Sequence, residues 1–329
     1  MRLPKIFTAI VGVVFLLASS TVHAEPKAMD FVDGVDWIKR VITVIGEGLA
    51  PQNTVNYTQA KGMASKAAQA DAYRKLSEII NGVHVEGDTT VEKMLTTHDR
   101  IQMRVAATIK GAKIISQAFL TDGSYRVIMQ VPLFGSSNSL ASAIFEKSST
   151  IEPFPNPVYS VMPSTPTYNS NTPIVPVNPN KPPLSRLQSD VTNLVTETIV
   201  LGTSGAPIKK SVEEFANLAK GDYTGLIVDC RGMGLKPVMS PVILNTNGTK
   251  IFGHKNLDIE KIVTMGMVDY VQDENAVSRA GENPLIVKPV KLENFNSNPV
   301  LSIADSNRVL IENHATKFLK ELKVVFLFD

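Results

Sequence analysis

The chain has 329 residues, of which 43% are hydrophobic and 19% charged, and its formal net charge at pH 7 is +2. This length is ample for two hydrophobic cores. The near balance of charge argues against a nucleic-acid binder, which would present a basic face. Cys230 is the only cysteine, so the chain cannot form an internal disulfide. The histidines are scattered along the chain, so a local cysteine–histidine metal site is excluded as well.

Residues 1–24 are predicted to be a secretory signal peptide. Arg2 and Lys5 supply its basic region, an apolar run follows over residues 6–18, and a small-residue cleavage site ends at Ala24. The apolar run is about half as long as a bilayer span, so an uncleaved anchor is the weaker alternative. Cleavage leaves equal numbers of basic and acidic side chains. We therefore expect an exported protein, periplasmic or associated with the outer envelope, without a later transmembrane segment and without a cysteine-linked lipid anchor.

Residues 25–147 are predicted to form an α+β domain that begins with a strand over 41–45, stopped by Gly46-Glu47-Gly48. The longest helical pattern of the chain follows over 56–80. Its small and apolar side chains share one stripe, which predicts close packing on a sheet. The stripe consists of Ala60, Ala64, Ala67, Ala68, Ala72, Leu76 and Ile79. Asn81-Gly82 is expected to end the helix in a left-handed cap.

The remainder of this domain is expected to alternate strands and helices. A half-exposed strand is predicted over 83–89, a weaker helix over 91–109, a hairpin with arms 113–120 and 124–131 around Asp122-Gly123, and a short closing helix within 139–147. This order describes an α+β layer structure with helices on one face of the sheet.

Residues 148–184 are rich in proline, and ten of the chain's twenty prolines lie between Pro153 and Pro183. Such a segment favours extended polyproline II conformations and has too little apolar surface to offset its ordering entropy. We interpret it as a semi-stiff spacer between two domains. The alternatives are a docking strip for a partner that reads proline-rich ligands and a spacer that crosses the cell wall.

Residues 185–329 are predicted to form a second α/β layer domain, so that the fold class is α+β with mixed or antiparallel sheets in two domains. Three helices are expected, over 186–200, over 211–221 with a capping box at Ser211, and over 304–313. Four strands are expected, over 225–228, 262–271, 284–288 and 323–327. Asn247-Gly248 predicts a type I′ hairpin between 243–246 and 249–252.

Four residues are candidates for a ligand-binding or structural loop: Asp229, Arg231, Arg279 and Asn283. Asp229 and Arg231 flank Cys230 at the end of a buried strand, where ligand sites of α/β sheets often lie. The simpler interpretation is an ion pair that fixes the loop. Cys230 is interpreted as a small buried hydrophobe, with a reactive thiol as the alternative.

The sequence offers no motif for catalysis, a cofactor or a metal. The four histidines outside the signal peptide do not pair at metal-ligand spacing, and Gly232-Met233-Gly234 lacks the rest of a dinucleotide motif. Residues 225–229 superficially look like a core strand of a C-terminal-processing serine protease, but no matching serine motif follows. We therefore predict a protein that is not an enzyme, and we expect no crevice in which titratable groups of both halves meet.

Several short motifs resemble a known family. The chain looks like the domain of the "Lpp twenty" family of bacterial envelope lipoproteins at residues 72–76, Gly82-Val83, Lys110-Gly111-Ala112 and Asp122-Gly123-Ser124-Tyr125. A related domain occurs at the N-terminus of flagellar assembly protein T. The C-terminal motifs are similar to an accompanying region in longer members. They are residues 223–229 with Arg231-Gly232, Arg279-Ala280-Gly281 and Asn283-Pro284-Leu285. The resemblance implies an envelope location and no established enzyme activity. The chain departs from the family in lacking the lipidation cysteine.

Together these features predict a non-catalytic exported cell-envelope protein. We expect a scaffold or assembly factor that contacts envelope proteins or surface-organelle components and binds no nucleic acid. The alternative is a periplasmic binding module for a small ligand or glycan, in which Asp229 and Arg231 would contact the ligand.

Overall fold

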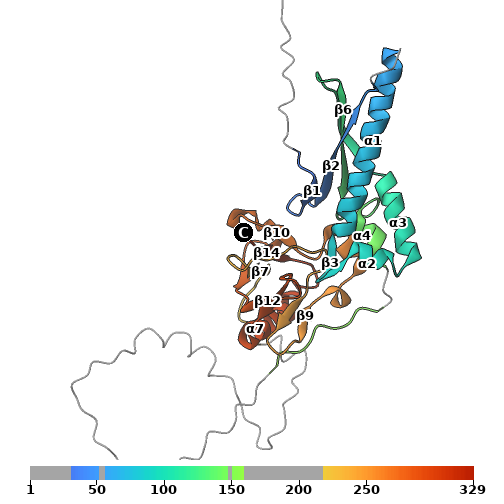
Figure 1. Ribbon diagram of the computed structural model, residues 1–329. Helices are drawn as coiled ribbons and strands as arrows, with labels where there is room; N and C mark the ends of the chain where they lie inside the picture. The colour runs from blue at the N-terminus through green and yellow to red at the C-terminus, as the bar shows by residue number, and fades with distance from the viewer. Residues whose placement is uncertain (1–30, 52–55, 147–149, 159–217) are drawn as a thin grey trace, which may run out of the picture.

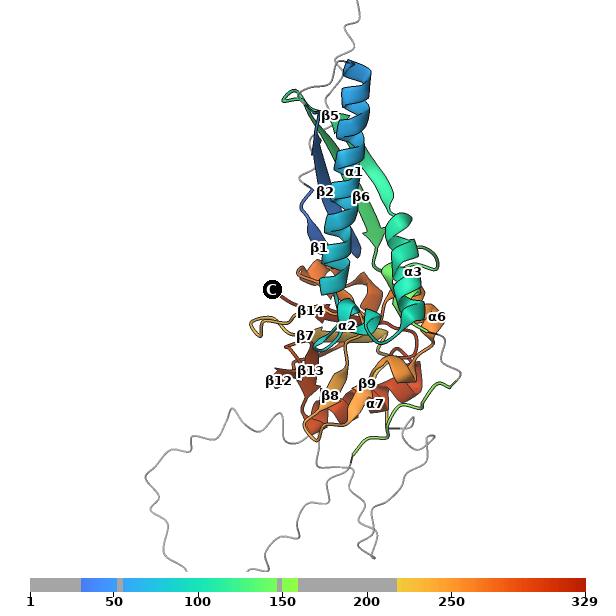
Figure 2. The ribbon, with the colours of Figure 1, turned by 45° about the vertical axis from the view of Figure 1, so that its right-hand side comes forward.

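The computed structural model describes residues 31–51, 56–146, 150–158 and 218–329. These residues form an elongated N-terminal unit and a rounder C-terminal unit, and the two pack against each other (Figures 1 and 2). The predicted signal peptide, most of the proline-rich stretch, the helix predicted over 186–200 and most of that predicted over 211–221 lie outside the described residues. The predicted α+β class, with antiparallel and mixed sheets, is confirmed.

The N-terminal unit contains an antiparallel four-stranded sheet in the order β1-β2-β6-β5. Its strands are β1 (Gly34–Asp36), β2 (Val41–Leu49), β5 (Lys113–Phe119) and β6 (Ser124–Pro132). The predicted hairpin around Asp122-Gly123 is confirmed, since β5 and β6 pair on either side of this turn. Val127, Met129 and Val131 of β6 point into the core, as their alternation predicts.

Helix α1 (Tyr57–Gly82) lies along one face of this sheet, over β2 and β6 (Figure 2). Asn56 caps its N-terminus, because the side-chain Oδ1 accepts a hydrogen bond from the amide of Thr58 at 2.9 Å. The buried stripe consists of Ala64, Ala68, Ala72, Leu76 and Ile80. It follows the predicted face, although Ala67 is exposed and Ile80, in place of Ile79, completes it.

Two predictions about the ends of these elements are wrong. The left-handed cap at Gly82 is absent, because Val83 is extended (φ −66°) and leads directly into the next strand. Strand β2 continues past Ile45 through two glycines to Leu49. A Cβ atom on Gly46 would lie 2.1 Å from the carbonyl oxygen of Ala68. The glycines therefore do not stop the strand; they allow the backbone of α1 to approach it.

The rest of the N-terminal unit adjoins the lower end of α1. It comprises the ribbon of β3 (His84–Glu86) and β4 (Thr89–Thr90) and the helices α2 (Val91–Leu95), α3 (Asp99–Lys110) and α4 (Leu140–Ile144). The single helix predicted over 91–109 is thus two helices, separated at residues 96–98. The short closing helix is confirmed as α4, which a capping box at Ser139 begins.

The C-terminal unit contains two four-stranded sheets, ordered β10-β14-β7-β11 and β12-β13-β8-β9. The first, all parallel, consists of β7 (Gly225–Asp229), β10 (Asp269–Val271), β11 (Pro284–Val287) and β14 (Val324–Leu327). The second consists of β8 (Ile243–Asn245), β9 (Lys250–Phe252), β12 (Lys291–Glu293) and β13 (Asn298–Leu301). The helices are α6 (Ile259–Met265), α7 (Ile303–Thr316) and the 3-10 turns η1 (His254–Asn256), η2 (Glu274–Ala276) and η3 (Ser278–Ala280).

Most predicted helices and strands of this unit that lie within the described residues are confirmed. In one case part of a predicted strand is a helix. Strand β7 is central and buried between β14 and β11, as its apolar run indicates. The strand predicted over 262–271 is wrong in its first half, which is helix α6. Asp258 caps this helix by accepting a hydrogen bond from the amide of Glu260, and Gly266 (φ +73°) ends it before β10.

The hairpin of β8 and β9 is confirmed, but its turn is not type I′. That turn requires positive φ at both central residues, whereas only Gly248 (φ +77°) has it. The loop has three residues, 246–248, because the amide of Asn245 donates to the carbonyl of Thr249 at 3.0 Å. The side-chain Oδ1 of Asn245 also accepts from the amides of Asn247 and Thr249 and fixes this wider turn.

The two units share a packed interface. The amides of Met239 and Ser240 donate to the carbonyls of His84 and Val85 at 3.1 and 2.7 Å, so the C-terminal chain continues the hydrogen bonding of β3. The side chain of Met239 lies within the core of the N-terminal unit. At the other side of the interface, the ring of Trp37 meets that of Tyr270 edge-on at 5.7 Å. The described units therefore form one body.

Residues 150–158, which we call the strap, begin the predicted spacer and are bound to the C-terminal unit. Asn307 of α7 accepts from the amide of Val158 and donates to its carbonyl, both at 2.7 Å. The chain is next described from residue 218, and the amide of Lys220 donates to Glu312, also of α7, at 3.0 Å. The described chain is thus bound to one helix, α7, on both sides of residues 159–217, and the rest of the predicted spacer lies outside the described residues.

Candidate functional site

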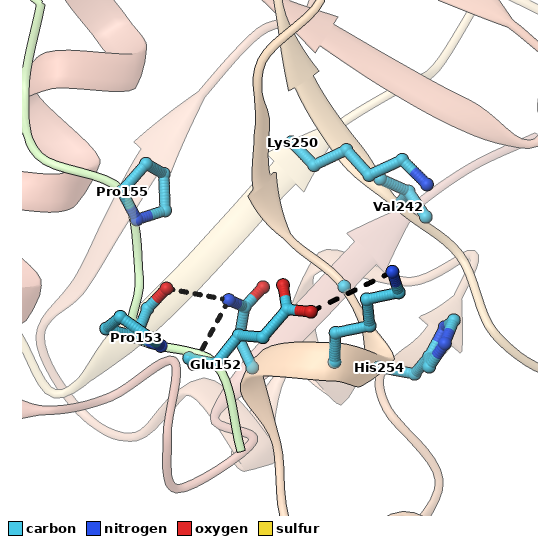
Figure 3. Close-up of a pocket in the computed structure, with 9 residues that line it drawn as sticks. Glu152, Pro153, Pro155, Val242, Lys250 and His254 are labelled. Carbon is cyan, nitrogen blue, oxygen red and sulfur yellow. Dashed lines mark hydrogen bonds and ion pairs between the residues drawn. The ribbon is translucent and has the colours of Figure 1, made fainter. Parts of the chain in front are cut away.

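Two hollows adjoin His254. The strap pocket, of about 200 Å³, lies between the strap, β9 and η1 (Figure 3). The inter-unit groove, of about 610 Å³, lies between the β3–β4 ribbon and the C-terminal unit. Both hollows are lined by charged and polar side chains, and we therefore take this region as the candidate site.

The strap pocket combines backbone polar groups with basic side chains. Asn256 holds the strap as one wall, because its side-chain amide donates to the carbonyls of Glu152 and Pro153 at 3.3 and 3.0 Å (Figure 3). Lys255 Nζ lies 3.8 Å from the carboxylate of Glu152, and Lys250 lines the opposite wall. Such a pocket can bind a small ligand that carries a carboxylate or phosphate.

The inter-unit groove brings Glu86 of the N-terminal unit to His254 of the C-terminal unit, and Lys250, which lines the strap pocket, also pairs with this carboxylate. The Glu86 carboxylate lies 3.5 Å from His254 Nδ1 and 3.6 Å from Lys250 Nζ. The expectation that no crevice would gather titratable groups from both halves is therefore wrong. These residues are distant in the sequence and share no motif, so nothing in the sequence signals that they meet.

Ser240 completes a group with His254 and Glu86 that has the composition of a hydrolytic triad but not its geometry. A triad uses both ring nitrogens, one for the hydroxyl and one for the carboxylate. Here the hydroxyl of Ser240 and the carboxylate of Glu86 both lie 3.5 Å from the same atom, His254 Nδ1. Ser240 is also only 1% exposed and its hydroxyl donates to the sulfur of Met267. These contacts position the imidazole and do not form a proton relay.

Asp229 and Arg231 form an ion pair at the carboxyl end of β7, as the simpler interpretation holds. The guanidinium donates to both carboxylate oxygens, at 2.9 and 2.8 Å, and also pairs with Glu274. The hydrogen bond from Arg231 holds the pKa of the Asp229 carboxyl below its ordinary value. Because its charges are paired within the loop, this group fixes the turn after β7.

Arg279 and Asn283 lie at the opposite, amino end of the same parallel sheet. Arg279 donates to the carbonyls of Leu322 and Gly266, both at 2.6 Å, and to the carboxylate of Asp269 at 2.8 Å. The amide of Asn283 donates to the hydroxyl of Thr224, which precedes β7. The structure therefore splits the four candidate residues between two edges of the sheet and does not bring them together in one site.

Cys230 is fully buried, and burial raises the pKa of its thiol to about 12. We expect the folded protein to resist a thiol reagent at mildly alkaline pH, because the thiolate is the reactive form and is not populated there. Absorbance of the released chromophore measures the labelling. The same chain in denaturant is the control and should react completely. Rapid stoichiometric labelling of the folded chain would contradict the interpretation of Cys230 as a core residue.

Within the described ranges, no group of three or more histidine, cysteine, aspartate or glutamate side chains is arranged to hold a metal ion. In the same part of the chain, no helix combines the length and the apolar composition that a membrane span requires. Both hollows therefore depend on individual polar groups and not on a cluster of ligands.

Comparison with known families finds a match within each unit. Residues 48–132 match the LPP20 lipoprotein family, from the end of β2 to the end of β6. This stretch is therefore similar to the LPP20 domain. The resemblance found in the sequence is thus confirmed, and LPP20 proteins are an envelope-associated lipoprotein family. Residues 225–329, from β7 to the end of β14 and beyond, match the second domain of Treponema pallidum Tp0624. No curated protein matches the chain.

Proposed function

We propose that this protein is a non-catalytic, exported cell-envelope scaffold or assembly factor that acts through contacts with other envelope or surface-organelle proteins. The LPP20-like domain supports the envelope location. The observation that carries the scaffold role is the shape of this domain, which projects as an arm from the C-terminal unit (Figures 1 and 2). A rigid body with a projecting arm is suited to holding partners at a distance.

The distal part of the arm exposes large apolar side chains. Leu49, the last residue of β2, is 73% exposed, and Tyr57, the first residue of α1, is 67% exposed. Tyr57 meets Phe119 edge-on at 6.5 Å, and the ammonium group of Lys61 lies 4.6 and 4.9 Å from the two ring centres. Aromatic side chains with a cation above them are typical of protein contact surfaces. We call this group the tip cluster.

Site-specific photocrosslinking in intact envelopes tests the proposal. A photoreactive residue replacing Tyr57 should give discrete adducts with a second, different envelope protein, because it lies in the tip cluster. The same residue at Lys288, which is exposed on the C-terminal unit, is the matched control and should not give those adducts. Absence of adducts at Tyr57, or the same adducts from both positions, would count against the scaffold role.

A second function, a binding module for a small acidic ligand or glycan, is supported by the strap pocket. Two lysines, Lys250 and Lys255, line it with one carboxylate, Glu152, so a carboxylate-bearing sugar is the ligand class that this excess of positive charge favours. Thermal unfolding in the presence of a hexuronic acid tests this function. A rise in melting temperature that Lys250→Ala removes and the exposed Lys291→Ala retains would support it. An unchanged melting temperature of the wild-type chain would contradict it.

A further inference from the structure

Among the described residues, strand β5 is an open edge of the LPP20-like sheet. Every side chain from Lys113 to Ala118 is exposed, because α1 packs on β2 and β6 and meets β5 at Phe119. No charged residue lies between Lys113 and Asp122. Edge strands of soluble proteins are usually short, charged, covered or strongly bulged, since an open edge pairs with other strands. In β5 the only irregularity is the register shift between Ile114 and Ser116.

The hydrogen bonds of the β5–β6 turn fix which backbone groups of β5 are free. The amide of Leu120 donates to the carbonyl of Ser124 at 2.8 Å, so these two residues are a hydrogen-bonded pair. Opposed pairs in an antiparallel ladder alternate between bonded and non-bonded. The next bonded pair is therefore Ala118 with its partner in β6. It follows that the amide and carbonyl groups of Phe119 and Gln117 point away from β6, toward the open edge.

The register of the ladder also fixes which side chains share a face. Gln117 is opposite Val127 and Phe119 is opposite Tyr125. Val127 is buried beneath α1, so Gln117 and Phe119 lie on the face that carries this helix. Ser116 and Ala118 lie on the other face, because successive side chains of a strand alternate.

We propose that β5 pairs antiparallel with β5 of a second copy of this chain, about a two-fold axis at Gln117. This register places Gln117 opposite Gln117 of the second copy, Ser116 opposite Ala118, and Ile115 opposite Phe119. The proposed register meets two conditions. The backbone groups that it pairs, those of Gln117, have no partner in β6, and the side chains that it places opposite each other lie on the same face of the sheet. A register centred on Ser116 also opposes side chains of the same face, but it fails the first condition, because the backbone groups of Ser116 already bond to β6.

We infer that the partner strand is β5 of a second copy, because two antiparallel copies of this strand can pair without opposing like charges. The two-fold register brings no like charges together, and the residues that it opposes on either side of Gln117, Ser116 and Ala118, are small and uncharged. The contact is isologous, so it closes as a dimer and does not extend into a fibre. A single pair of strands buries little surface, and we therefore expect a reversible, concentration-dependent dimer. This inference does not depend on the proposed scaffold function.

Charge substitutions at the axis test the pairing in the whole chain without its signal peptide. Sedimentation velocity should show a dimer for the wild type and monomers for Gln117→Lys and for Gln117→Glu, because each variant places like charges at the axis. An equimolar mixture of the two variants should dimerise again. Ile286→Lys on the exposed edge strand β11 is the matched control and should dimerise as the wild type does. Circular dichroism verifies that each variant is folded.

Cysteine substitution distinguishes the proposed register from other dimers. Gln117→Cys should form an intermolecular disulfide, because directly opposed Cα atoms lie within the range that a disulfide spans. Ser116→Cys should not, since in this register the two Ser116 residues are diagonal neighbours, about 7–8 Å apart. Native Cys230 is buried and does not compete. A wild type that remains monomeric, or a dimer that Gln117→Lys leaves intact, would overturn the inference.

Discussion

Gly46→Ala is expected to lower the free energy of unfolding of the N-terminal unit by about 3 kcal/mol. The added Cβ would lie 2.1 Å from the carbonyl oxygen of Ala68 and 2.6 Å from the Cβ of Ala72. Neither contact can be relieved by rotating a side chain, since one atom is backbone and the other belongs to alanine. Helix α1 would have to move away from β2, and its buried alanine stripe would separate from the sheet. Urea denaturation followed by far-ultraviolet circular dichroism measures the loss.

Gly62→Ala is the matched control, because Gly62 lies in α1 and a Cβ there meets no atom within 4 Å. It should leave stability unchanged or raise it by about 0.5–1 kcal/mol, since alanine is the better helix former. Gly48→Ala should resemble Gly46→Ala, because its Cβ would lie 2.3 Å from the carbonyl oxygen of Ala64. Equal stability of the Gly46 and Gly62 variants would show that α1 does not rely on glycine for its approach to β2.

Arg279→Leu is expected to destabilise the C-terminal unit by about 3 kcal/mol or more. The Arg279 side chain is only 8% exposed and joins three segments of the chain, through the carbonyls of Leu322 and Gly266 and the carboxylate of Asp269. Leucine would fill much of the space but remove this donor from the two carbonyls, and Asp269 would keep only its longer contact with Arg40, at 3.5 Å. Arg279→Lys should recover little of the loss, because one ammonium group cannot reproduce the planar fork of donors. Thermal and urea unfolding measure both variants.

Arg231→Leu provides the comparison within the same unit. Arg231 also pairs with carboxylates, but its side chain is 40% exposed, and its partners are the half-buried Asp229 at the end of β7 and the exposed Glu274 of η2. Water can replace those hydrogen bonds, so the loss of stability should be much smaller than for Arg279→Leu. If the two variants lost equal stability, the assignment of Arg279 as an internal clamp would be incorrect.

Helices and strands whose own hydrophobic pattern shows which face is buried were predictable from the sequence. The alanine stripe of α1, the alternation of β6 and the apolar run of β7 each report burial directly, because the periodicity of a helix or strand is local. The α+β class and the two layered units followed from their order. The resemblance to LPP20 proteins came from motifs that the family comparison then matched.

The errors arose where tertiary contacts decide the local conformation. Gly46 and Gly48 suggest the end of a strand in isolation, but α1 packs against them and the strand continues. Residues 262–271 are apolar enough for a strand, yet the cap at Asp258 begins a helix. The groove between Glu86 and His254 had no local signal, because its two sides come from different units. The interface between the units likewise depends on contacts that no single stretch encodes.

The attachment of the strap and of Lys220 to α7 has a consequence for the C-terminal unit. Asn307 and Glu312 are separated by about 7–8 Å along the helix axis, so Val158 and Lys220 are bound at nearly the same place. One helix therefore holds the described chain both before residue 159 and after residue 217. A substitution that displaces α7 would release both attachments together, whereas a substitution at Asn307 or Glu312 alone would release only one of them.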